Sequence, residues 1–472
     1  MGFFVSSLWK LIYIEGYMKT IEELTKQTLG SDNLLALRLS KAEIRPFLHY
    51  AKQNGCVWVS GEQIDEEHDL LDAPYAFICI EANKTISKLS AMCWCKSTNL
   101  IKIEFKDLFE VGCKHLETSE SVNIGHSDKT CDTIADAFLD EALKQDKFSQ
   151  MAVECAIKNN KLFVYGEATT NAKIDYAKIA KNILKQIGYT CDFDVIIEVS
   201  TQSPDINQAV NRTKLCANDQ GICYGYATNE TKQYMPLPIL IAHKLMQQYE
   251  TFRQTHNQFF ADAKSQVTVE YIDNTPIRID TVLISVSHSE DLSTTEIQQI
   301  IKQQVVDVAL KEFEQYLSDT KFIINPSGKF TIWGSFGDSG CVGRKIVVDT
   351  YGGVGRVGGG CFSSKNATKV DRSGAYYARY VAKNIVAHNL ADKCEVELCF
   401  GIGLSKPLAI NINTFGTEKV DISLIYDYVN KNFNFELDNI IKELDLLKPI
   451  YQKTACFGHF GREEFSWEMI KN

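Results

Sequence analysis

Residues 325–372 read NPSGKFTIWGSFGDSGCVGRKIVVDTYGGVGRVGGGCFSSKNATKVDR, and eleven of the chain's 28 glycines fall between Gly328 and Gly360. Glycine permits turns with positive φ and lets backbone N–H groups approach an anion closely. Cationic side chains accompany these turns, at Lys329, Arg344, Lys345, Arg356, Lys365, Lys369 and Arg372. The stretch therefore predicts a segment that holds a polyphosphate. The alternative is a set of tight turns between short strands with solvated cations.

The composition is that of a soluble globular protein, and 472 residues suffice for about two to four domains. A net charge of −10 argues against a protein that grips nucleic acid over a broad surface. The 15 cysteines are scattered without a CxxC pair, which favours reduced thiols in a cytoplasmic protein and disfavours a zinc site. The apolar N-terminal run contains Lys10 and Glu15, so neither a membrane span nor a secretory signal is predicted. Both Met1 and Met18 are candidate starts.

Hydrophobic patterning changes near residue 113. The region 1–112 predicts a small α+β domain of unknown role, with a helix at Lys41–Asn54 and strands at Cys56–Val59, Tyr75–Glu81 and Ile101–Phe105.

The region 113–472 predicts repeated strand and helix units, which favours an α+β fold of antiparallel sheet covered by helices. Helices are expected at Ile134–Leu143, at Ile179–Ile187 with Gly188 as the C-terminal cap, and at Thr294–Leu317. Strands are expected in a hairpin, Met151–Ile157 and Lys161–Tyr165 about Asn159 and Asn160, and at Ile277–Ser287, Lys345–Asp349, Glu395–Phe400 and Leu408–Thr414.

The motif Gly125-His126-Ser127-Asp128-Lys129 places an imidazole, a carboxylate and an ammonium directly before a helix. Asp128 could hold a hard cation, and His126 could donate to a phosphate or a leaving oxygen. Alternatively, Asp128 or Ser127 is a helix N-cap and His126 is a turn residue.

Further polar groups interrupt apolar runs. Glu154 and Glu167 lie in the two strands of the predicted hairpin, where a carboxylate is costly unless it is exposed, paired or bound to a cation. The polar loop 202–208 follows a strand, and Asp262 and Lys264 precede one. Such loops often cover an active site, although most only connect elements, and exposed charge pairs contribute little energy.

Eight motifs occur in one order: GHSDK (125–129), GEATT (166–170), QSPDINQ (202–208), NDQGICYGYATNET (218–231), DAKSQVT (262–268), GRKIVVDTYGG (343–353), KVDRS (369–373) and GHFGRE (458–463). In these motifs the chain resembles the S-adenosylmethionine synthetase (methionine adenosyltransferase) family, from about Lys114 to Trp467.

The resemblance implies a fold of three similar α+β domains related by a pseudo-threefold axis, discontinuous in sequence. The segments combine as 113–124 with 229–333, 125–213 with 334–372, and 214–228 with 373–472. It also implies a homodimer with shared active sites, flat sheets at the dimer interface, and tetramers formed by pairs of dimers. The role of residues 1–112 stays open between recruiting an unknown protein and setting the oligomer.

The implied reaction is attack of the methionine sulfur on C5′ of ATP, followed by hydrolysis of the displaced triphosphate to pyrophosphate and phosphate. Carried over by motif, the catalytic residues are His126, Lys264, Arg344, Lys345, Lys365 and Lys369. ATP would also contact Asp262, Ala263, Lys329, Phe330, Asp338 and Cys361, and methionine would contact Glu167, Gln202, Asp338 and Lys369. Two Mg²⁺ ions per site would use Asp128, Glu120 and Asp371, and K⁺ would use Glu154.

The sequence departs from the family pattern at several of these motifs, notably at Ser127, Asn218, Trp333, Cys361 and Ser364. The segment from Gln202 to Asp219 is also a few residues short. Every charged residue with a direct phosphate or metal role is retained. The second hypothesis is a catalytically impaired relative that binds nucleotide and acts through partners.

Overall fold

The computed structural model describes residues 114–202 and 215–471, together with the backbone of five strands in the first 113 residues. The chain divides into two compact units, Met1–Cys113 and Lys114–Asn472. None of the described helices is both long and apolar enough to cross a membrane.

The first unit contains one five-stranded sheet in the order β2-β4-β3-β1-β5. β1 pairs antiparallel with β3 and parallel with β5. Three of these strands confirm the prediction, and two strands (β1 and β4) were not predicted. The helix expected at Lys41–Asn54 and the two candidate start residues lie outside the described residues. The strands are β1 (Leu34–Ser40), β2 (Val57–Trp58), β3 (Tyr75–Ile80), β4 (Thr85–Leu89) and β5 (Leu100–Glu104).

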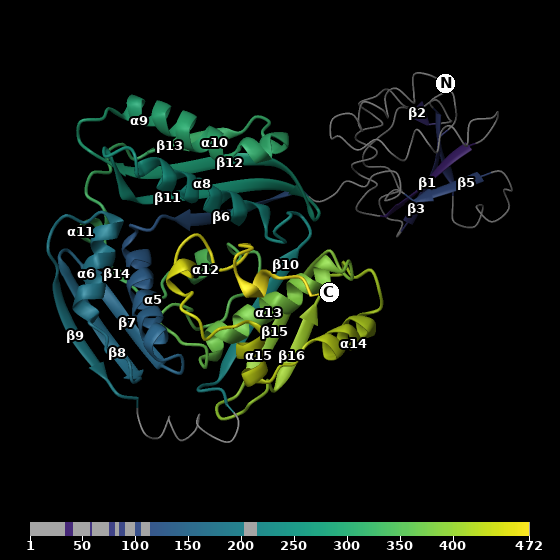
Figure 1. Ribbon diagram of the computed structural model, residues 1–472. Helices are drawn as coiled ribbons and strands as arrows, with labels where there is room; N and C mark the ends of the chain where they lie inside the picture. Colours follow the sequence, from purple (N-terminus) through teal and green to yellow (C-terminus); the bar gives the residue numbers. More distant parts are fainter. Residues whose placement is uncertain are drawn as a thin grey trace. The chain divides into compact units, whose positions relative to one another are not determined.

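The second unit contains three sheets, shown in Figure 1, and each combines strands that are far apart in the sequence. The first sheet is β13 (Lys321–Ile324), β12 (Thr275–His288), β11 (Phe259–Ile272) and β6 (Lys114–Val122). The second is β14 (Gly340–Cys341), β7 (Gln150–Lys158), β8 (Lys161–Thr169) and β9 (Asp194–Ser200). The third is β10 (Gly221–Thr228), β15 (Lys393–Phe400) and β16 (Ala409–Asn413).

One long helix packs on each sheet: α5 (Ser127–Gln145) on β7, α8 (Leu237–Arg253) on β6 and β11, and α13 (Val370–Ala387) on β10 and β15. This mixture of sheets and covering helices confirms the α+β class. The other α-helices among the described residues are α6 (Tyr176–Ile187), α9 (Thr294–Ile301), α10 (Asp307–Ala309), α11 (Gly334–Gly337), α12 (Ile346–Asp349), α14 (Ile422–Asn432) and α15 (Leu437–Glu443). The π and 3₁₀ segments are η3 (Lys302–Val306), η4 (Lys311–Tyr316), η5 (Gln452–Thr454) and η6 (Ser466–Glu468).

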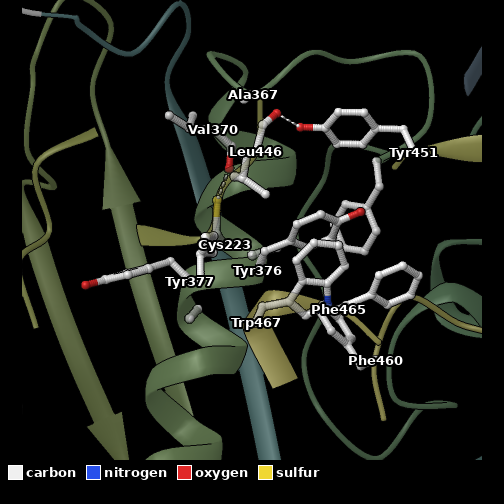
Figure 2. Packing of buried hydrophobic residues seen from close by; sticks show 14 of the residues in the cluster. Cys223, Ala367, Val370, Tyr376, Tyr377, Leu446, Tyr451, Phe460, Phe465 and Trp467 are labelled. Atoms are coloured by element: carbon white, nitrogen blue, oxygen red, sulfur yellow. Dashed lines mark hydrogen bonds between the residues drawn. The ribbon is translucent and has the colours of Figure 1, made fainter. Parts of the chain in front are cut away.

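Aromatic side chains join the C-terminal segment to the core (Figure 2). Trp467 is fully buried and stacks on Tyr376 of α13, with ring centroids 3.9 Å apart. Phe465 also stacks on this indole, at 4.7 Å. Cys223 of β10 donates its thiol to the Val370 carbonyl at 3.1 Å, which ties the sheet to α13. The segment around Phe465 and Trp467 is therefore packed into the core of the second unit.

Most local predictions are confirmed. The hairpin turns at Asn159, which has φ of 51°, and Gly188 ends α6 with φ of 122°. The strand predicted at Lys345–Asp349 is wrong, because the residues form the short helix α12. Glycines with positive φ, Gly343 and Gly352, flank this apolar run and turn the chain at both ends. The helix predicted at Thr294–Leu317 is helical in α9, η3, α10 and η4, but changes its hydrogen-bond pattern along its length.

Candidate active site

The N-terminus of α5 carries the first cluster of candidate residues. His126 is the N-cap, because its Nδ1 accepts from the Asp128 N–H at 3.2 Å. The alternative of Ser127 or Asp128 as the N-cap is therefore wrong. The Asp128 carboxylate is 1% exposed and accepts from Lys345 Nζ at 2.7 Å and from the Cys341 N–H at 3.0 Å. Arg344 Nε lies 3.5 Å from the same carboxylate.

Asp128 is an anion in this setting. Burial alone would raise its pKa, but the hydrogen bonds from Lys345 and Cys341 outweigh it, and the pKa of Asp128 is lowered. A hard cation prefers such a carboxylate.

His126 is neutral. Burial, with the charges of Lys264 and Lys345, lowers its pKa to about 3. Since Nδ1 accepts a hydrogen bond, the neutral ring carries its proton on Nε2. That N–H is available to a developing negative charge.

A second cluster lies at the other end of the glycine-rich stretch. Lys365 Nζ is 2.7 Å from Asp371 Oδ2. Burial works to lower the pKa of Lys365, but Cys361 and Asp371 outweigh it and raise that pKa. Burial and the charge of Lys365 lower the pKa of Lys369. The two ammonium groups therefore share one anion-attracting region.

The two clusters meet at the Gly343 turn. A Cβ placed on Gly343 would lie 2.8 Å from Cys361 Sγ, so this turn requires glycine there. The Glu154 charge contributes to raising the pKa of Lys365, and Glu167 acts on Lys369 in the same sense. These two glutamates of the hairpin therefore face the second cluster.

The candidate nucleotide residues include Asp262 on β11. Asp262 Oδ2 accepts from the Gly334 N–H at 2.9 Å, whereas Oδ1 is buried without a hydrogen-bond partner among the described residues. Burial raises the pKa of Asp262 to about 6. His288 holds the Phe330 backbone on both sides: its backbone N–H donates to the Phe330 carbonyl at 2.9 Å, and its Nε2 accepts from the Phe330 N–H at 3.1 Å.

The remaining candidates make no side-chain hydrogen bond or ion pair to these clusters within the described residues, although the charges of Lys264 and Asp338 act on His126 and Asp262. Glu120 is exposed on β6, and within the described residues it makes no hydrogen bond or ion pair with another candidate. Lys329 and Asp338 lie in the loops before and after α11, and Asp338 accepts from the Ser339 N–H at 2.8 Å. Ala263 is buried, and its carbonyl accepts from the Asn123 N–H at 2.9 Å. Lys264 is exposed on β11.

Gln202 begins the polar loop, and its buried Oε1 has no hydrogen-bond partner in the part of the chain that the structure describes. Its N–H donates to Thr169 Oγ1 at 3.4 Å. The rest of the loop 202–208, and most of the shortened segment up to Asp219, lie outside the described residues.

Asn218 stood out in the sequence only as a departure from the family pattern, and its contact with a candidate residue was missed. With its amide oriented to satisfy both neighbours, the side-chain oxygen accepts from Lys369 Nζ at 3.1 Å and the nitrogen donates to the Thr368 carbonyl. The sequence shows that Asn218 lies beside Asp219 in an expected motif. It does not show the contact with Lys369, because that residue is distant in the sequence. The role of four aspartates in α5 was also missed, although their four-residue spacing is evident in the sequence.

Three family models match the part of the chain that carries these clusters. Residues 114–212 match the N-terminal domain of S-adenosylmethionine synthetase, 214–330 match its central domain and 332–469 match its C-terminal domain. The chain belongs to the S-adenosylmethionine synthetase family.

The chain matches S-adenosylmethionine synthases of several bacteria over most of their length. The S-adenosylmethionine synthase of Mycoplasma capricolum subsp. capricolum is 48% identical over 373 residues, 76% of this chain and 95% of the relative. That of Mesoplasma florum is 47% identical over 369 residues, 76% of this chain and 98% of the relative. That of Sorangium cellulosum is 44% identical over 366 residues, 74% of this chain and 86% of the relative.

Proposed function

We propose that the two clusters catalyse the transfer of the adenosyl group of ATP to the sulfur of L-methionine. The chain is a methionine adenosyltransferase: sulfur attacks C5′, triphosphate leaves, and the triphosphate is then hydrolysed to pyrophosphate and phosphate. The observation that carries this function is the pairing of cations with two carboxylates. Arg344 and Lys345 lie at Asp128, which follows the neutral His126. Lys365 and Lys369 lie near Asp371.

Leaving-group stabilisation is the main contribution of the protein in this reaction, since displacement at carbon needs no covalent nucleophile. Lys264, Arg344, Lys345 and Lys365 hold the departing triphosphate, and Lys329 extends this surface. The Nε2–H of His126 donates a hydrogen bond to the bridging oxygen that leaves C5′ and stabilises the charge that develops there. A neutral imidazole suits this role because it keeps one N–H donor at Nε2, and the charges of Lys264 and Lys345 help to keep the ring neutral.

Orientation of the substrates falls to the other candidates. Asp262 Oδ1, which is buried without a partner among the described residues, accepts from the nucleoside. The Ala263 backbone borders the nucleoside, and Phe330 stacks on adenine. Cys361 and Asp338 line the phosphate end.

Methionine lies between Glu167, Gln202, Asp338 and Lys369. Within the described residues Gln202 Oε1 has no donor, so it is an acceptor for the ammonium group of methionine. Lys369 suits the carboxylate of the same substrate.

Metal ions fit the carboxylates at both clusters. Asp128 and Asp371 would hold Mg²⁺ through their carboxylate oxygens, and each of these carboxylates is paired with a lysine in this structure. Two Mg²⁺ ions, with Glu120 as a further ligand, would neutralise the triphosphate charge. Glu154, beside the Tyr165 hydroxyl at 3.5 Å, offers an oxygen to K⁺.

A second copy of the chain would complete the site. On the β7–β8 hairpin, Glu154 is paired with Tyr165, and Ala156 with Phe163, so these side chains share one face. Phe163 is 41% exposed there, and Ile196 of the adjacent β9 is 49% exposed. A homodimer that covers this face buries apolar surface and places Glu154 and Glu167 against the partner. Homotetramers would then form from pairs of dimers.

The three sheets support the proposed domain division. We place residues 113–124 with 229–333, 125–213 with 334–372 and 214–228 with 373–472, because each of the three sheets draws its strands from the corresponding segments. None of the ten described cysteines forms a disulfide, which supports a cytoplasmic location.

The test is formation of S-adenosylmethionine by the purified protein from ATP and methionine with Mg²⁺ and K⁺. Lys365→Ala is expected to lower kcat about 100-fold or more, because it removes a triphosphate contact. Lys144→Ala is the matched control, since this lysine lies on the exposed end of α5 and pairs with Glu141. ATP binding without any product would instead favour the non-catalytic relative.

A further inference from the structure

Four aspartates lie along one face of α5, at Asp128, Asp132, Asp136 and Asp140. A spacing of four residues brings side chains to nearly the same side of an α-helix. All four are buried, with exposures of at most 6%. Each carboxylate accepts a backbone N–H from a residue more than 200 positions away, so this aspartate row fixes distant turns of the chain against one helix.

Asp132 holds the turn that carries the first pair of cations. Its Oδ1 accepts from the Gly343 N–H at 2.9 Å, and its Oδ2 accepts from Lys129 Nζ at 2.9 Å. Lys129 is fully buried and also binds Asp349, the last residue of α12. The chain between Gly343 and Asp349, which contains Lys345, is therefore attached to α5 at both ends.

Asp136 holds the turn that carries the second cluster. Its Oδ1 accepts from the Ser364 N–H at 3.0 Å, and both oxygens accept from Arg372 at 2.8 Å. Arg372 also donates to the Lys365 carbonyl at 3.1 Å. The backbone is thus held just before Lys365, at the Ser364 N–H, and just after its Cα, at the Lys365 carbonyl.

Asp140 holds a segment outside the site. Its two oxygens accept from the Tyr451 and Gln452 N–H groups, both at 2.9 Å, at the start of η5. The same helix therefore provides an internal control with the same residue type, spacing and kind of hydrogen bond.

The turns at Gly343 and Ser364 lie in a part of the stretch with little regular secondary structure, and both residues have positive φ. Glycine adopts positive φ freely, whereas Ser364 keeps this conformation only because surrounding contacts fix it. A displacement of about 1 Å in a group that contacts the reacting atoms can lower a rate about 100-fold.

We infer that Asp132 and Asp136 are positioning residues for the adenosyl transfer. They set the distance of Arg344, Lys345 and Lys365 from His126 and Asp128 without touching substrate. This inference rests on the proposed function of the two cation clusters.

Asp132→Asn is the sharpest test, with Asp140→Asn as the matched control. An amide has one acceptor oxygen, so at position 132 it satisfies either the Gly343 N–H or Lys129. The Asp349 carboxylate keeps the buried ammonium paired, which supports folding of the Asp132→Asn variant. The amide in Asp140→Asn likewise satisfies only one of two backbone N–H groups.

We expect Asp132→Asn to lower kcat about 10-fold and to raise the Kd of Mg²⁺–tripolyphosphate by a similar factor. Asp140→Asn is expected to change urea stability but neither of these two quantities. Calorimetry with inorganic tripolyphosphate measures the affinity independently of turnover. Wild-type affinity and kcat in Asp132→Asn would overturn the inference, and so would equal losses in both variants.

The two proposals fail in different ways. Wild-type protein that makes no S-adenosylmethionine overturns the proposed function. A tripolyphosphate affinity that falls in Asp132→Asn and not in Asp140→Asn would still support the positioning role.

Discussion

Trp333 stacks on Tyr189 with ring centroids 4.6 Å apart and planes inclined by 30°. Phe260 lies near the indole as well, at 6.0 Å and 23°. The next residue, Gly334, donates its N–H to Asp262, and the Tyr189 hydroxyl accepts from the Ser335 N–H at 2.8 Å. This aromatic contact therefore fixes the loop that borders the proposed nucleotide site.

Trp333→Ala is expected to raise the KM for ATP about 10-fold with a smaller effect on kcat, because the loop loses its aromatic contact and Asp262 its fixed partner. Trp333→Phe keeps a ring and is the matched control, with a KM within about twofold of wild type. Steady-state kinetics at saturating methionine provides the measurement. An equal KM in all three proteins would contradict a role of the indole in nucleotide binding.

Ser364→Gly is expected to stabilise the protein by about 1 kcal/mol, since a non-glycine residue is strained at positive φ. Ser364 has φ of 79°, and its buried hydroxyl has no hydrogen-bond partner among the described residues. Ser364→Ala removes the hydroxyl and keeps the strain, so the two variants separate the contributions. Urea unfolding gives both free energies; a glycine variant no more stable than the alanine variant would argue against backbone strain.

Asp140 provides a pH-dependent prediction. Burial raises its pKa to about 6, although the Gln452 and Tyr451 N–H groups oppose this. The unfolded carboxyl titrates near pH 4, so between about pH 4 and 6 the folded protein holds a proton that the unfolded chain has lost. The contribution of Asp140 to stability therefore falls as pH rises through this window and is constant above it.

Asp140→Asn cannot titrate at this position. The difference in unfolding free energy, wild type minus variant, should decrease by up to about 3 kcal/mol from pH 4 to 6.5 and then level off. Urea titrations at several pH values measure this difference, in which other titrating groups cancel. A constant difference over the window would show that Asp140 is ionised throughout.

A chain that starts at Val111 is expected to keep kcat within about twofold, because every described candidate residue lies in the unit that begins at Lys114. Light scattering of the shortened and full chains separates the two roles considered for residues 1–112. An unchanged number of subunits supports recruitment of another protein. An altered number of subunits supports a role in setting the oligomer.

Local patterns in the sequence predicted the elements whose stability is local. The helix α6 with Gly188, and the hairpin about Asn159, follow from periodicity and turn residues within a few positions. The apolar run before Asp349 was misassigned because nothing within it reveals the contact of Asp349 with Lys129, more than 200 residues away in sequence. Strand periodicity alone cannot distinguish such a run from one helical turn.

The candidate residues came from motifs, and the pairing of Asp128 with Lys345 was beyond sequence reasoning because it joins distant segments. The role of His126 as N-cap was missed for a simpler reason. Histidine is a less common cap than the serine and aspartate that follow it, so propensity favoured the wrong residues. Interleaved domains were expected only from the family resemblance.

The first sheet has a consequence for biosynthesis. β6 pairs with β11, but four other strands lie between them in the sequence. The ribosome therefore completes β7, β8, β9 and β10 before it makes the partner of β6. The nascent chain therefore exposes an unpaired strand edge for much of its synthesis, and non-local pairing of this kind folds slowly. Production of this enzyme should thus depend on the supply of chaperones more steeply than its final stability would suggest.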